Sequence, residues 1–304
     1  MTSTRWLVLL LCAMPCIAAC SDTPKAKAAE LRQIEAARKR EVARRLAAAA
    51  ATPDKMLPVG MWIMPPQLRE ISGLALTSRG TVLTHDDNSG RVSEIDPKTG
   101  ILVKSFSLIG NQKEDFEAIT IAGNDIYLMA SDGKLFRFRE GDDGQQVSFM
   151  MFDTGLGKLC EFESLAYEAD STRLLMACKR GVGNDAPKDL IIYRMPLPLN
   201  RATFRQTLTI LQVPLNDVVG TNQWKSFRPS DMTIDPFTKN LVIIASHEHG
   251  LAVLTPDGDV VRSGPLPGDH KQPEGVAITK DSILVISDEA NVNPAAITLY
   301  KWRP

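Results

Sequence analysis

Gln272-Pro-Glu-Gly-Val-Ala277 is one copy of a six-residue signature that occurs five times in the sequence. The other copies are Glu70-Ile-Ser-Gly-Leu-Ala75, Asp115-Phe-Glu-Ala-Ile-Thr120, Glu161-Phe-Glu-Ser-Leu-Ala166 and Arg228-Pro-Ser-Asp-Met-Thr233. Aligned on their third residues, Ser72, Glu117, Glu163, Ser230 and Glu274, successive copies are 45, 46, 67 and 44 residues apart. Repeats of roughly 40 to 50 residues are typical of propeller blades. The spacing predicts an all-β propeller.

The last unit has the strand pattern of a blade. Two short apolar segments, 275–278 and 282–287, flank the turn at Lys280-Asp281, and 296–302 alternates in character. The chain then ends one strand short of a four-stranded blade. Residues 57–64 form an apolar run ahead of the first signature. We expect this run to be the outer strand that closes the ring, because closure removes exposed sheet edges.

The 67-residue step leaves the number of blades undecided between five and six. A sixth, degenerate blade could lie within it. Alternatively, one long blade has strands near 163–167, 173–178, 189–194 and 206–213, followed by a connection through Trp224 and Phe227. We favour five blades.

Charge separates a tether from the folded domain. Residues 21–50 carry eight Lys and Arg against four Asp and Glu, whereas residues 51–304 have a net charge of −6. We divide the chain into a signal peptide (1–19), a linker (20–54) and a propeller domain (55–304). An acidic domain is a poor match for nucleic acid, since phosphate contacts need clustered basic charge.

The N-terminus has the features of a lipoprotein signal. Arg5 precedes the apolar stretch 6–17, and Ile17-Ala-Ala-Cys20 matches a lipobox, in which Cys20 is acylated. The alternative is an ordinary secretory signal cleaved after Ala19. The residue after Cys20 is Ser21 rather than Asp, and in this the sequence resembles lipoproteins sent to the outer membrane. We therefore expect a lipid anchor in the cell envelope, on the periplasmic side of the outer membrane rather than in the inner membrane.

The linker has a strongly helix-favouring composition of Ala, Lys, Arg and Glu. Its apolar residues form a broken stripe, Leu31, Ile34, Val42 and Leu46. This pattern predicts a solvated helical spacer rather than a coiled coil.

Cys160 and Cys178 lie in neighbouring predicted strands of one hairpin. Strict pairing places Cys178 opposite Glu163, so Cys160 must curl back to form a disulfide. The alternative is two small buried side chains.

Propeller topology gathers the polar residues on one face. The start of each innermost strand and the end of the second strand lie on the same side, which places the four histidines, His85, His247, His249 and His270, with the signatures. We assign to this ligand-binding face the acids Glu70, Asp87, Asp132, Glu248, Asp288 and Glu289.

Two interpretations remain open for the signature acids Glu117, Glu163, Asp231 and Glu274. Each carboxylate could accept backbone N–H groups and tie the ring together. Alternatively, the four could hold a hard cation, with Ca²⁺ as the expected metal. Carboxylates about 4 Å apart repel by about 4 kcal/mol at an effective dielectric of 20. A converging ring therefore needs a cation, raised pKa values or wider spacing.

The signatures, together with Ile286-Ser-Asp-Glu-Ala-Asn291, resemble the SdiA-regulated, YjiK-like family of bacterial envelope propellers over about residues 57–304. The resemblance to esterase-like phytase domains is looser. Gln-Pro-Glu-Gly and Asp-Phe-Glu are the most specific elements. Ala118 and Ser164 replace the glycine frequent after the acid, and Ala290 replaces a proline. The resemblance implies a propeller with bound calcium and names no substrate.

Two functions fit these features. The first is a lipid-anchored binding or scaffolding module that holds a small molecule or protein at the propeller face. The second is a Ca²⁺-dependent hydrolase of an ester, lactone or phosphoester, in which His247 or His85 transfers the proton. We favour the binding module, because a propeller needs no reaction to be useful.

Overall fold

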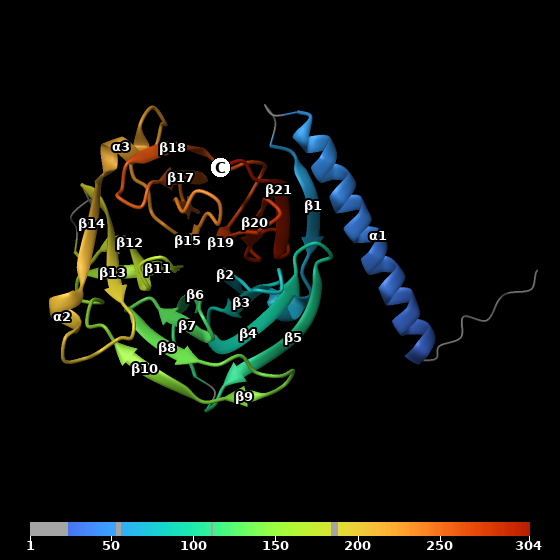
Figure 1. Cartoon of the computed structure of the whole chain (residues 1–304), viewed down its shortest axis with the longest axis horizontal. Helices are drawn as coiled ribbons and strands as arrows, with labels where there is room; N and C mark the ends of the chain where they lie inside the picture. Colours follow the sequence, from blue (N-terminus) through green and yellow to red (C-terminus); the bar gives the residue numbers. More distant parts are fainter. Residues whose placement is uncertain (1–23, 53–55, 111, 184–187) are drawn as a thin grey trace, which may run out of the picture.

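The computed structural model describes residues 24–52, 56–110, 112–183 and 188–304. The proposed signal peptide and Cys20 lie outside these residues. The described part of the chain forms one long helix, α1 (Pro24–Ala50), and five sheets, antiparallel except for one short edge strand, arranged around a centre (Figure 1). No helix within the described ranges has the length and apolar character needed to cross a membrane.

Each sheet is one blade, numbered here in chain order. Blade 1 contains β2 (Ile71–Leu76), β3 (Val82–Asp86), β4 (Ser89–Asp96), β5 (Ile101–Leu108) and β9 (Gln146–Val147). Blade 2 contains β6 (Phe116–Ala122), β7 (Asp125–Ala130), β8 (Lys134–Phe138) and β10 (Phe149–Asp153). Blade 3 contains β11 (Cys160–Glu168), β12 (Arg173–Gly181), β13 (Asp189–Pro196) and β14 (Thr209–Pro214). Blade 4 contains β15 (Asp231–Ile234), β16 (Leu241–Ala245), β17 (Gly250–Leu254) and β18 (Val260–Pro265). Blade 5 contains β19 (Pro273–Ile278), β20 (Ile283–Asp288), β21 (Ala296–Lys301) and β1 (Pro58–Ile63).

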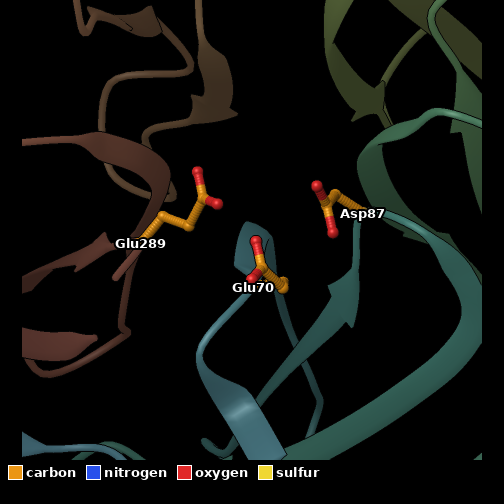
Figure 2. Close-up of side chains that lie close together, drawn as sticks. All are labelled: Glu70, Asp87 and Glu289. Carbon is orange, nitrogen blue, oxygen red and sulfur yellow. The ribbon is translucent and has the colours of Figure 1, made fainter. Parts of the chain in front are cut away.

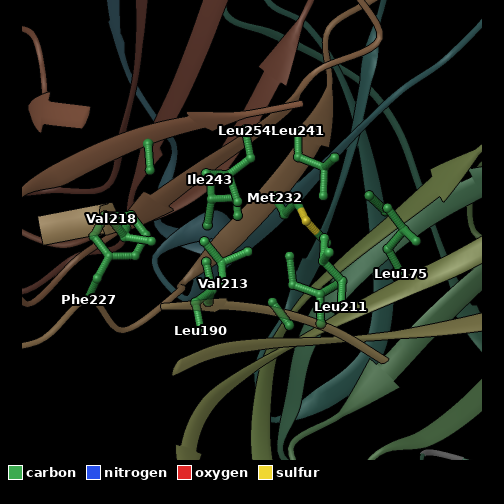
Figure 3. Close-up of a cluster of buried hydrophobic side chains, with 14 of the residues drawn as sticks. Leu175, Leu190, Leu211, Val213, Val218, Phe227, Met232, Leu241, Ile243 and Leu254 are labelled. Atoms are coloured by element: carbon green, nitrogen blue, oxygen red, sulfur yellow. The ribbon is translucent and has the colours of Figure 1, made fainter. Parts of the chain in front are cut away.

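Apolar side chains fill the space between adjacent blades. Strand β16 shows why: Leu241 and Ile243 pack against blade 3, whereas Val242 and Ile244 pack against blade 5. Successive side chains of a strand point to opposite faces, so a blade buried on both sides needs a continuous apolar run. Five such clusters fill the five interfaces, and Figure 3 shows the one between blades 3 and 4. The prediction of five blades is confirmed.

Strand β1 closes the ring as predicted for residues 57–64. It pairs antiparallel with β21, with Met61 opposite Thr298 and Ile63 opposite Ala296. The outermost strand of blade 5 therefore comes from a segment that precedes blade 1 (Figure 1).

The 67-residue step is the length of blade 3 and its connection to blade 4. The short helices α2 (Phe204–Thr207) and α3 (Leu215–Val219) flank β14, and Phe227 in the following connection is buried beside Trp224. A short 3-10 helix, η1 (Pro66–Leu68), links β1 to β2. The parallel pairing of β9 with β5 was not predicted.

Helix α1 lies along blade 5, so the prediction of a fully solvated spacer is wrong for its C-terminal half (Figure 1). Val42 is 1% exposed and packs into the cluster between blades 5 and 1. Gly60 makes room for it, since a Cβ at Gly60 would lie 3.3 Å from Val42 Cγ2. The Arg38 guanidinium stacks 4.9 Å from the Trp62 ring centre, and Lys39 forms an ion pair with Asp96 at 2.9 Å.

Candidate functional site

Three of the four signature acids project from β-bulges at the starts of the inner strands, whereas Asp231 pairs with Ile244 in regular register. In blade 2, Phe116 pairs with Ala130 and Ala118 with Met129, which leaves Glu117 as the extra residue. Glu163 in blade 3 and Glu274 in blade 5 occupy the same kind of position. A bulge re-aims one side chain without ending the strand pairing, and bulges are common next to functional sites. The repeat therefore fixes where each carboxylate points.

The ends of the second strands lie on the same face as these bulges. The ladder pairs Ile71 with Asp86, Glu161 with Arg180, and Pro273 with Asp288. We call this side the acidic face.

The Lys179 ammonium pairs with one signature acid, Glu163, and its charge also acts on Glu117 and Glu274. Glu163 forms an ion pair with Lys179, which extends from the end of β12. Burial, followed by the charge of Glu163, holds the pKa of Glu117 well above its usual range. Burial and Glu163 also raise the pKa of Glu274 to about 7, while Lys179 lowers it. A lysine therefore supplies positive charge to these three acids. We call Glu117, Glu163, Glu274 and Lys179 the Lys179 ring.

Asp231 takes a different role. Its carboxylate is fully buried and accepts the backbone N–H groups of Met232 at 2.8 Å, Val276 at 2.8 Å and Leu74 at 3.1 Å. These donors come from β15, β19 and β2, so one side chain joins three inner strands. Such bonds satisfy backbone groups on the channel edges of those strands, which have no neighbouring strand there.

A second group of acids forms where blades 5 and 1 meet on the acidic face. Ligand oxygens of Glu70, Asp87 and Glu289 all lie within 4.8 Å of one another (Figure 2). We call this group the acid triad. Burial and a hydrogen bond with Glu70 raise the pKa of Glu289, and burial followed by the charge of Glu70 raises that of Asp87. The triad thus concentrates negative charge at one point.

Neighbouring polar groups already engage parts of the triad. Arg69 forms an ion pair with Glu70 at 2.9 Å. The Gln272 side chain donates to Glu289, and the Asn88 side chain donates to Asp87 at 2.5 Å. These contacts orient the three carboxylates while leaving them close together.

The other three acids assigned to this face have local partners. Asp132 forms an ion pair with Lys134 at 2.9 Å. Glu248 accepts the hydroxyl of Ser226 and the backbone N–H of Arg228. Asp288 lies 2.5 Å from His270 Nδ1 and accepts the backbone N–H of Lys271. The structure does not place these acids in the triad.

The two histidines considered for proton transfer lie in different environments. His85 is 2% exposed, and burial lowers its pKa to about 4, so its imidazole is neutral. Its Nε2 has no hydrogen-bond partner in the described part of the chain. His247 is 68% exposed and lies 3.1 Å from Glu248.

A disulfide joins Cys160 and Cys178, with a Cα separation of 5.6 Å. In the ladder Cys160 lies opposite Gly181 and Cys178 opposite Phe162, and one register shift lies between these two pairs, which leaves Lys179 as the extra residue of β12. The disulfide thus spans the bulge that carries Lys179, and the bulge that carries Glu163 follows directly, between Phe162 and Ser164.

The structure groups Glu70, Asp87 and Glu289, which sequence reasoning placed on the same face without identifying them as a cluster. Sequence reasoning also missed the role of Lys179 among the signature acids. Its position at the end of a second strand was the available signal, because every such end reaches the acidic face.

Residues 225–301 match the SdiA-regulated family. The match confirms the resemblance found in the sequence. The SdiA-regulated segment begins just before β15 and ends with β21, so it includes Asp231, Glu274 and Glu289.

Several solved structures are similar to this chain at low sequence identity. The glutaminyl cyclase of Myxococcus xanthus is similar with a TM-score of 0.51 and 12% identity, over 80% of this chain and 94% of that one. A PQQ-bound aldose sugar dehydrogenase from Streptomyces coelicolor has a TM-score of 0.48 and 12% identity, over 80% of this chain and 98% of that one. A gluconolactonase from Xanthomonas campestris has a TM-score of 0.44 and 14% identity, over 76% of this chain and 71% of that one. No curated protein matches the chain significantly in sequence. The similarity to the glutaminyl cyclase concerns the fold alone.

Proposed function

We propose that this protein is a lipid-anchored envelope propeller that binds a ligand on its acidic face with the help of a divalent cation, Ca²⁺, at the acid triad. The observation that supports the proposal is the approach of Glu70, Asp87 and Glu289 to within 4.8 Å. Three carboxylates from separate parts of the chain repel one another unless a cation or a proton compensates them.

The triad has dimensions suited to calcium. Ca²⁺–O distances are about 2.3–2.6 Å, so two oxygens on opposite sides of one ion are about 5 Å apart. Three carboxylates offer up to six oxygens, and Ca²⁺ takes about six to eight, the remainder from water or carbonyls. A ligand that carries oxygen atoms could then complete the coordination.

The proposed metal position differs from the one expected from the sequence. Glu163 already pairs with Lys179, whose charge also acts on Glu117 and Glu274, and Asp231 is occupied by backbone donors. A divalent cation in that ring would have to displace Lys179. The acid triad imposes no such requirement.

The hydrolase alternative needs a proton-transfer group beside the cation. His85 is enclosed and His247 is turned to Glu248, and neither belongs to the acid triad. Their positions favour the binding module. We expect no metal-dependent turnover of ester, lactone or phosphoester panels; turnover that His247→Ala abolishes would establish the hydrolase.

Calcium should raise the melting temperature of the metal-stripped protein. A ligand that binds only the folded state stabilises it by RT ln(1 + [L]/Kd), about 2.7 kcal/mol at a hundredfold excess over Kd. Glu289→Gln and Asp87→Asn should each reduce this response, because each removes one anionic ligand. Glu163→Gln is the matched control: it alters an acid of the Lys179 ring and should leave the response intact.

The same experiment has a pH arm. Burial and a hydrogen bond with Glu70 raise the pKa of Glu289 to about 8, so Ca²⁺ must displace a proton below that pH, and its affinity should increase as pH rises toward about 8. A melting temperature that neither millimolar Ca²⁺ nor a chelator changes would exclude the cation site. Loss of the response in Glu163→Gln, but not in Glu289→Gln, would instead place the ion in the Lys179 ring.

A further inference from the structure

A tyrosine, a histidine and an aspartate form a line of hydrogen bonds in blade 5, next to the acid triad. The Tyr300 hydroxyl lies 2.9 Å from His270 Nε2, and His270 Nδ1 lies 2.5 Å from the Asp288 carboxylate. All three residues are buried, and Asp288 directly precedes Glu289 of the triad. We call these three residues the Tyr300 network.

The partners fix where the protons of this network lie. A carboxylate only accepts hydrogen bonds, so Nδ1 of the neutral imidazole must donate to Asp288, and Nε2 is left to accept the Tyr300 hydroxyl. Burial raises the pKa of Tyr300 above its usual range, so the hydroxyl keeps its proton and remains a donor. Both nitrogens of the His270 ring therefore have partners, which fix the orientation of the ring.

The connection 266–272, between β18 and β19, passes directly against Tyr300. Gly268 has a φ of +83°, and a Cβ at this position would overlap the Tyr300 hydroxyl. Both the backbone conformation and the close approach require glycine. His270 follows two residues later and reaches Tyr300 and Asp288 from this connection.

The Tyr300 network is linked to the acid triad through Gln272. The other oxygen of Asp288 accepts the backbone N–H groups of Lys271 at 3.0 Å and Gln272 at 3.3 Å. The Gln272 carbonyl accepts the backbone N–H of Glu289 at 3.0 Å, and the Gln272 side chain donates to the Glu289 carboxylate. Gln272 thus holds both the backbone and the carboxylate of one triad acid.

The same segment is tied to blade 1. The backbone N–H of Ala290 donates to the Arg69 carbonyl at 2.8 Å, and Arg69 forms an ion pair with Glu70. The segment 288–290 therefore contacts the parts of the chain that carry two of the three triad acids.

We propose that His270 is a positioning residue for the cation site of the acid triad, an inference that rests on the proposed function. Held between Tyr300 and Asp288, it fixes the connection that carries Gln272. Gln272 in turn holds Glu289 in place for the cation. His270 is not itself a ligand, because both of its ring nitrogens are engaged.

Calorimetric titration of the metal-stripped full chain with Ca²⁺ measures the effect. His270→Ala should bind Ca²⁺ about tenfold more weakly than the wild type, the lower end of the range for groups that support metal ligands. His270→Asn should recover most of the affinity, because its amide nitrogen takes the place of Nδ1 and can donate to Asp288. Tyr300→Phe, which keeps the ring, should weaken binding in the same direction as His270→Ala.

Trp302→Phe is the matched control. The buried Trp302 indole N–H donates to Asp235 at 3.0 Å, and Trp302 directly follows β21, the strand that contains Tyr300. The variant loses a buried hydrogen bond at the end of β21 that faces away from the acidic face. It should lower the melting temperature and leave the Ca²⁺ affinity unchanged. Equal weakening of Ca²⁺ binding by Trp302→Phe and His270→Ala would reduce the effect to general loss of stability and overturn the proposal.

Amide hydrogen exchange of the wild type tests the same link without a substitution. Coupling between two sites is reciprocal, so Ca²⁺ should slow the exchange of the Lys271 and Gln272 amides, which donate to Asp288. The amide of Asp259, which donates to Thr255 in the turn between β17 and β18, should not change.

The outcomes separate this inference from the proposed function. Ca²⁺ that binds the wild type, yet alters neither of the two amides and binds His270→Ala equally well, would overturn the role of His270 alone. Failure of Ca²⁺ to bind the wild type would overturn the cation site and this inference together.

Discussion

Lys179, at the end of β12, brings a positive charge to a group of three carboxylates and so changes their pKa values. Burial raises the pKa of Glu117, Glu163 and Glu274, and the Lys179 charge opposes the rise for each. Because folded-state pKa values are raised, the folded protein binds more protons than the unfolded chain. For Glu274 this holds between the ordinary carboxyl pKa and about 7, and stability falls as pH rises through that window.

Lys179→Met should test the balance between the burial of the three acids and the positive charge of Lys179. Removing one partner of a fully buried ion pair costs about 3–5 kcal/mol. The Lys179 side chain is 30% exposed, so we expect a smaller loss, about 1–3 kcal/mol, in urea unfolding at pH 8. The loss should shrink at pH 5, where protonation relieves the repulsion. Lys179→Arg should stay near wild type, and a Met variant as stable as wild type at pH 8 would contradict the ion-pair role.

The sequence identified which acids share a face but not which of them meet. Topology alone places the starts of inner strands and the ends of second strands together. The grouping of Glu70 with Glu289 depends on how blades 5 and 1 pack, and the approach of Lys179 to Glu163 depends on a bulge. Both are set by contacts between distant segments, which leave no local pattern in the sequence.

At the scale of elements, the hairpin of β11 and β12 combines a bulge, a disulfide and an ion pair within a few residues. The disulfide crosses the bulge between Cys160 and Cys178, and the Glu163–Lys179 pair lies beside it. A covalent link here restrains the bulge that carries Lys179, the partner of Glu163.

Replacing both cysteines by alanine should destabilise the protein by about 3 kcal/mol, because a loop of this size loses its cross-link in the unfolded state. Urea unfolding with and without a dithiol reductant measures the effect. The wild type should lose stability on reduction, whereas the double variant should not respond. A wild type indifferent to reductant would show that the bond contributes nothing to stability.

Helix α1 shows that the periodicity of its apolar residues does not predict where the helix packs. Its broken stripe of apolar residues is too weak to predict a partner. Docking depends on features of other elements: the small Gly60 in β1 and the Trp62 ring that Arg38 covers. A sequence window over the helix contains neither.

At the scale of the whole molecule, the five blades and the closure by β1 could be predicted because the repeat, the missing strand and the unassigned run are all linear features. The proposed lipid anchor precedes α1 in the sequence, so it would attach the propeller through that helix.

Cys20→Ala tests that anchor. The substitution should leave an unacylated precursor or a soluble periplasmic form, since the acylated residue of the proposed lipobox is lost. Metabolic labelling with a palmitate analogue and membrane fractionation measure the outcome. Continued labelling of the variant would show that acylation takes place elsewhere.

The pairing of β1 with β21 has a consequence for biogenesis. Ribosomes make β1 before every other strand of the ring and its partner β21 after all of them, so this contact has the greatest sequence separation in the propeller. Contacts of this kind form late and slow the folding of β proteins. Until then β1 exposes an unpaired edge that invites aggregation, and α1, which packs beside β1, is the neighbour available to cover part of it during folding.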